Sequence, residues 1–66
     1  MKLSQVVETL DRVIEQKKSY LQEQKTALQM ATFPEETAIR ATVDFVTLNV
    51  EELQRIATDL KNVTEL

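Results

Sequence analysis

The stretch at residues 31–36, Ala-Thr-Phe-Pro-Glu-Glu, divides the 66-residue chain into two halves. Pro34 has no amide hydrogen, so it is costly inside a helix but suits a helix's first turn. It also disfavours helical geometry at Phe33, which precedes it. Because Pro34 is the only proline and glycine is absent, this stretch is the one strong break, and the sequence predicts two long elements joined by a turn at 32–34.

Both halves carry apolar residues at the three- and four-residue spacing of a helix face. We therefore predict helices over residues 3–31 and 35–64, with Ser4 as a candidate N-cap residue of the first. Residues 42–48 are rich in β-forming residues, which leaves a strand as the alternative there. The stripe of the second half consists of Ile39, Val43, Val46, Val50, Leu53, Ile56, Ala57, Leu60 and Val63.

A chain reversal at the break brings large apolar residues of the two halves opposite one another. The pairs recur every seven residues in both halves, which is heptad spacing. The predicted fold is therefore all-α, a single antiparallel two-helix hairpin domain over residues 1–66. The apolar pairs are Val7 with Leu60, Ile14 with Leu53, Leu21 with Val46, and Leu28 with Ile39.

Polar residues interrupt this contact line at two levels, where Lys17 lies opposite Asn49 and Gln24 lies opposite Thr42. Polar residues at core heptad positions fix register and oligomer state at a cost in stability, and we assign this polar core layer that role. One alternative is a layer that holds a ligand within a bundle. Another is that Lys17 extends its ammonium group to solvent.

A further apolar strip in the second half is offset from the main stripe. A single hairpin cannot bury both, and chains this short usually need disulfides, a metal or oligomerisation for stability. Cysteine and histidine are absent, which excludes disulfides and the usual zinc and iron ligand sets. We predict self-association into a four-helix, dimeric bundle, with a groove for a different protein as the alternative. The strip consists of Ala38, Ala41, Phe45 and Leu48.

The composition argues against catalysis and against a membrane location. There is no histidine, cysteine or glycine-rich phosphate loop, and the adjacent carboxylates of Glu35–Glu36 and Glu51–Glu52 point apart on a helix. We predict no catalytic residue, no cofactor and no metal site. The net charge of −3 gives no bulk attraction to nucleic acid. No apolar run reaches the roughly 20 residues that span a bilayer, and no signal region opens the chain, so the expected location is cytoplasmic.

A small set of basic and aromatic residues is the candidate for contact with an anion or RNA. Residues 25–33 also resemble the opening helix segment of the Rop family of plasmid RNA-binding helical hairpins, with Gln29 and Thr32 differing. In that family the segment lies early in the first helix and its Phe contacts RNA, whereas here it ends at the break. The candidate residues are Lys18, Lys25, Arg40, Tyr20 and Phe33.

The functional hypothesis that fits these patterns is a non-enzymatic protein–protein interaction module. It would be a small regulator, inhibitor or assembly factor that acts as a helical-hairpin oligomer, with itself as first partner. The alternative is a helical bundle that binds RNA or a phosphorylated small molecule through Lys18, Lys25 and Arg40. The patterns leave open the identity of any other partner and the choice between a dimer and a higher oligomer.

Overall fold

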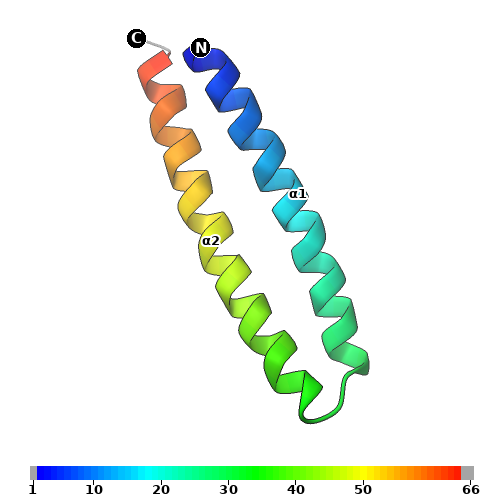
Figure 1. Cartoon of the computed structure of the whole chain (residues 1–66). Helices are drawn as coiled ribbons and strands as arrows, with labels where there is room; N and C mark the ends of the chain where they lie inside the picture. Colours follow the sequence, from blue (N-terminus) through cyan, green and yellow to red (C-terminus); the bar gives the residue numbers. More distant parts are fainter. Residues whose placement is uncertain (1, 65–66) are drawn as a thin grey trace.

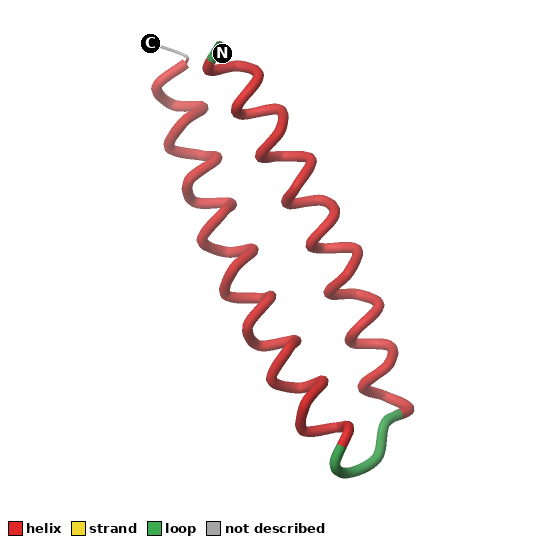
Figure 2. The backbone as a smooth tube through the Cα atoms, viewed as in Figure 1, coloured by secondary structure: helices red, strands yellow, loops and turns green. Residues whose placement is uncertain are grey.

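The computed structural model describes residues 2–64 and shows two long antiparallel helices (Figure 1). Helix α1 spans Leu3–Met30 and helix α2 spans Glu35–Thr64. The start of α1 and the end of α2 lie side by side, and the turn forms the opposite end, or tip, of the hairpin (Figure 2). The all-helical hairpin is thus confirmed, and the strand alternative for residues 42–48 is wrong. Helix α1 ends one residue earlier than predicted.

The start of α1 differs from the prediction, because Lys2 and not Ser4 is the N-cap residue. The side-chain oxygen of Gln5 accepts a hydrogen bond from the Lys2 amide at 3.2 Å. The Gln5 amide in turn donates to the Lys2 carbonyl at 3.0 Å. A glutamine at the third helical position thereby satisfies the backbone of the N-cap residue from inside the helix, and Ser4 lies within the first turn.

The turn is closed by backbone hydrogen bonds and needs no glycine. Ala31 leaves α1 in an extended conformation, and its amide donates to the Leu28 carbonyl at 3.3 Å. The Phe33–Pro34 peptide bond is cis. The Glu36 amide then donates to the Thr32 carbonyl at 3.0 Å. Two carboxylates in the first turn of α2 suit the positive end of the helix dipole.

The core is a narrow line of contact between the two helices. Ile14, Val50 and Ala57 are buried, and Leu10, Val46 and Leu53 pack against them. Ile14 and Leu53 therefore belong to one cluster, as the heptad register requires. The hairpin measures 50 × 16 × 14 Å. Its radius of gyration of 15.1 Å exceeds the roughly 11 Å of a compact 66-residue domain, so much of the chain lies close to solvent.

Two residues of the predicted inward stripe of α2 do not face α1. Ile56 is 41% exposed and Val63 is 59% exposed. Two helices in contact bury only the residues along the line between them, and both side chains lie at the edge of the stripe. Neither helix, over the described residues, has a segment that is long and apolar enough to cross a membrane.

Candidate functional site

The helix contact line separates two broad faces, and each face has a groove between α1 and α2. Residues two apart on a helix point in nearly opposite directions. Val13 and Ile56 line one groove, whereas Glu15 and Thr58 line the other, so the grooves lie on opposite faces. The grooves enclose about 510 Å³ on the polar side and about 460 Å³ on the apolar side.

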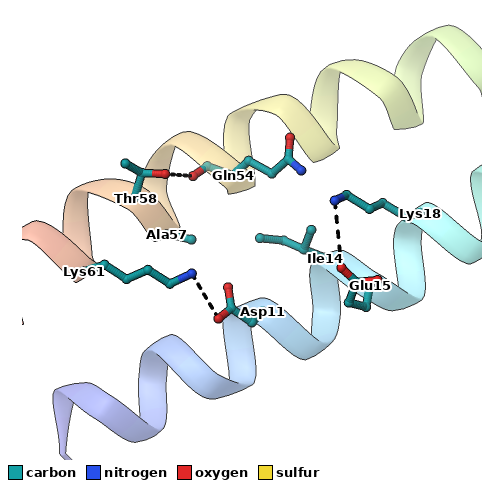
Figure 3. A pocket seen from close by; sticks show the side chains of 8 residues that line it. All are labelled: Asp11, Ile14, Glu15, Lys18, Gln54, Ala57, Thr58 and Lys61. Atoms are coloured by element: carbon teal, nitrogen blue, oxygen red, sulfur yellow. Dashed lines mark hydrogen bonds and ion pairs between the residues drawn. The ribbon is translucent and has the colours of Figure 1, made fainter.

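The polar groove is lined by charged and hydroxyl side chains above the buried Ile14 and Ala57 (Figure 3). The Lys61 ammonium of α2 reaches across to the Asp11 carboxylate of α1, at 3.2 Å from Nζ to Oδ2. Within α1, Lys18 Nζ lies 3.8 Å from Glu15 Oε1. Because these side chains are about half exposed or more, such pairs contribute on the order of 0–1 kcal/mol each. The two positive and two negative charges cancel, so this groove attracts neither anions nor cations strongly.

The charged groups outside the polar groove lie dispersed over the surface of the described helices. Within residues 2–64, no three side chains of the metal-binding types gather into a cluster that could hold an ion. The pKa of the Arg55 guanidinium is raised, first because the Glu52 carboxylate accepts its hydrogen bonds and then because of nearby negative charge. This pair lies on exposed surface.

The apolar groove is built by both helices and contains one hydroxyl side chain, that of Thr9. Along α1, its apolar character continues from Val13 to Tyr20, seven residues later. Along α2, it continues from Ile56 to Val63 and, three turns in the other direction, to Phe45. We call this surface the groove face. The groove itself is lined by Val6, Thr9, Leu10, Val13, Leu53, Ile56 and Leu60. Helical spacing extends the groove face to the exposed Tyr20, Ala27, Ala38, Phe45 and Val63.

The groove face arises because apolar residues on each helix come as two adjacent positions, which together cover more of the helix surface than one neighbouring helix can bury. Adjacent apolar pairs recur every seven residues in α1, and at spacings of seven and eleven residues in α2. The hairpin uses the second member of each pair for its own contact. That member is the more buried one in every pair except Val6–Val7, where both are half-buried. A stripe of this width is typical of helices with more than one neighbour. The other pairs are Val13–Ile14, Tyr20–Leu21, Ala27–Leu28, Ala38–Ile39, Phe45–Val46 and Ile56–Ala57.

The apolar strip predicted as the interface is exposed along its whole length but does not lie in one plane. Ala38 and Phe45 are seven residues apart and belong to the groove face. Leu48 lies five residues before Leu53, which turns it by about 140° around the helix. Ala41 lies seven residues before Leu48 and therefore shares its direction. Leu48 is thus turned about 60° further from the groove than Phe45, its neighbour three residues earlier.

The four polar residues of the predicted core layer, Lys17, Gln24, Thr42 and Asn49, are all half-buried. Lys17 lies between Val13 and Tyr20 at helical spacing, so its stem follows the groove face. Gln24 is four residues beyond Tyr20 on the same side. Thr42 and Asn49 flank Phe45 in the same way on α2. The layer therefore lies at the seam between the hairpin's own contact and its open apolar face.

The candidate anion-binding residues are exposed but are not brought together. Lys18 lines the polar groove and pairs with Glu15. Arg40 pairs with Glu36 on α2. Tyr20 lies on the opposite groove face, and Phe33 lies at the tip. Two of the three cations thus already have carboxylate neighbours, and the aromatic side chains lie elsewhere.

No protein-family model, curated protein or solved structure matches this chain. Sequence reasoning identified the apolar stripes but treated the stripe of α2 as wholly buried, and so missed the groove between Val13 and Ile56. The signal that could have revealed it is the repeat of adjacent apolar pairs.

Proposed function

We propose that this protein is a non-enzymatic protein–protein interaction module, a small regulator, inhibitor or assembly factor that acts as a helical-hairpin oligomer. Its binding surface is the groove face. The observation that carries the proposal is the apolar groove between Val13 and Ile56, on the face opposite a charge-balanced polar groove. The polar groove favours contact with water, whereas the apolar groove favours contact with another apolar surface.

The hairpin leaves several large apolar side chains of the groove face in water. Phe45 is 72% exposed, and Val63 and Ile56 also remain exposed. Full burial of a large apolar side chain contributes about 1.5–3 kcal/mol. The free energy gained by burying these three side chains is comparable with the lower end of the roughly 5–15 kcal/mol that stabilises a typical domain. A partner on the groove face therefore stabilises the fold and is bound by the same contacts.

The shape of the surface favours a helical partner. A groove between two packed helices accepts a ridge of side chains from another helix. Such a partner presents apolar residues at helical spacing, which is the helix-in-groove mode of recognition. The helices of a second copy satisfy this requirement, and so does an amphipathic helix of a different protein.

The proposal is tested with two matched lysine substitutions two residues apart on α2. Ile56→Lys places a charge on the groove face, and Thr58→Lys places the same charge in the polar groove. Each replaces an exposed β-branched residue, so effects on helix propensity are similar. Wild type and both variants serve as bait in quantitative capture from the native host. Proteins retained by wild type and Thr58→Lys but lost with Ile56→Lys support the proposal, whereas identical capture by all three contradicts it.

A further inference from the structure

We propose that a second copy of this chain covers the groove face, with both tips at the same end and α1 of each copy against α2 of the other. This inference rests on the proposed function and names the first partner and its orientation. In this arrangement every neighbouring pair in the four-helix bundle is antiparallel. The arrangement follows from the exposed area, the positions of apolar residues, the charge of the two helices and the place of Lys17.

The hairpin exposes more surface than its mass predicts. A compact 7.6 kDa protein exposes about 4,300 Å², whereas this chain exposes 5165 Å². The excess is close to the roughly 800 Å² per partner of a standard protein interface. One further hairpin of the same size on one face is therefore sufficient to bring the exposed area to the value of a compact protein.

The apolar residues of the groove face match between two copies in this orientation. In this orientation α1 runs antiparallel to α2 of the second copy, as it does to α2 of its own hairpin. The apolar halves of the two groove faces, at the end opposite the tips, therefore meet each other. Val13 then lies level with Ile56 of the other copy, and Val6 lies level with Val63. Tyr20 lies near Phe45 of the other copy, and the small Ala27 lies near Ala38. With the tips at opposite ends, the apolar groove would instead meet the half that contains Gln24 and Thr42.

The charges of the two helices favour the same orientation. Residues 1–33 contain five basic and four acidic side chains, whereas residues 34–66 contain three basic and seven acidic side chains. With the tips together, each α2 borders the α1 of the other copy, so unlike charges are neighbours. With the tips at opposite ends, a face-to-face twofold axis places α1 beside α1 and the acidic α2 beside α2. Like charges across such an interface weaken association.

The half-buried Lys17 gains a partner only when the tips are together. Lys17 makes no ion pair within the described part of the hairpin. Glu52 lies one turn from Ile56, on the border of the groove face, and in this orientation it approaches Lys17 of the other copy. Its carboxylate binds Arg55 but has lone pairs for a second donor. In the opposite orientation the midpoints of the two α1 helices meet, which brings the two Lys17 ammonium groups together.

The orientation is measured by pulsed electron–electron resonance between nitroxide labels. The chain has no cysteine, so Met30→Cys near the tip and Asn62→Cys near the other end each give one label per copy. Both positions are exposed, and Met30 at 84% lies outside the hairpin contact. With the tips together, both variants give separations below about 35 Å, because neighbouring helix axes in a bundle are about 8–10 Å apart.

Separations near 50 Å, the length of the hairpin, overturn the orientation. A sedimentation mass that stays at 7.6 kDa up to millimolar concentration, with no dipolar signal, overturns the second copy as partner. The capture experiment with Ile56→Lys and Thr58→Lys reads out other proteins and decides the proposed function independently. Circular dichroism of both labelled variants verifies that the helices are retained.

Discussion

Ile56 and Ala57 are adjacent in α2, yet Ile56 is 41% exposed on the groove face while Ala57 is 3% exposed between the helices. The side chains of two neighbouring residues thus point in different directions, one into the core of the hairpin and the other onto its open apolar face. The same division separates Val13 from Ile14 in α1. Each helix therefore has one apolar edge in the core of the hairpin and a second apolar edge that remains open to solvent.

The small side chain of Ala57 is buried in the contact between the two helices. Ala57→Leu forces a larger group into the contact line and is expected to lower the free energy of unfolding by about 1–3 kcal/mol, as overpacking does. Ala41→Leu is the control, because Ala41 is exposed and the same change there should alter stability little. Urea denaturation followed by circular dichroism measures both. Equal effects of the two substitutions would show that the helices are not in contact at Ala57.

The half-buried Lys17 is expected to limit stability. Lys17→Leu should raise the free energy of unfolding by about 1–2 kcal/mol, since a packed apolar side chain often replaces a buried charge with a gain. Lys18→Leu, one residue later at the polar groove, should not. Thermal melts of the two variants make the comparison. If Lys17→Leu leaves the melting temperature and the oligomer unchanged, the Lys17 ammonium lies in solvent.

The Asp11–Lys61 ion pair crosses the hairpin but lies in water. Asp11→Asn removes the charge with little change in shape, and we expect a loss of at most about 1 kcal/mol at low salt. The loss should shrink in 1 M salt, because exposed charges are screened. Denaturation of wild type and Asp11→Asn at two salt concentrations tests this expectation. A loss of several kcal/mol that persists in high salt would contradict it and would indicate a buried pair.

Phe45 and Leu48 are both exposed on α2, but they differ in direction. Phe45→Glu places a charge on the groove face and should dissociate the oligomer. Leu48→Glu places the same charge on the outer side of α2 and should leave the oligomer intact. Light scattering coupled to size-exclusion chromatography distinguishes the masses. Dissociation by Leu48→Glu with retention by Phe45→Glu would move the interface to the outer side of α2.

The hairpin was predictable from sequence because its determinants are local. Pro34 and the absence of glycine fix one break, and the heptad stripes fix helices on both sides. The N-cap was not predictable in the same way, since Gln5 satisfies the Lys2 amide through a side chain that reaches back one turn. Ser4 has the more common capping side chain but lies two residues after the N-cap position.

The groove face was only partly predictable, because burial depends on how many neighbours a helix has. Periodicity shows that Ile56 and Val63 are on the apolar side of α2, and it cannot state that a single neighbour leaves them in water. The strip of Ala38 and Phe45 was identified because it lies away from the main stripe. Val13 was hidden within the apolar stripe of α1, and Leu53 within that of α2. Only the positions of the two helices show that they line one groove.

The most direct test of the groove face as the interaction surface is sedimentation equilibrium on wild type, Thr58→Lys and Ile56→Lys at tens of micromolar. We predict twice the chain mass of 7.6 kDa for wild type and Thr58→Lys. Ile56→Lys should sediment as a monomer, because burial of an unpaired ammonium on this face costs more than the interface gains. A dimeric Ile56→Lys with an unchanged association constant, or a monomeric wild type, would contradict self-association through the groove face.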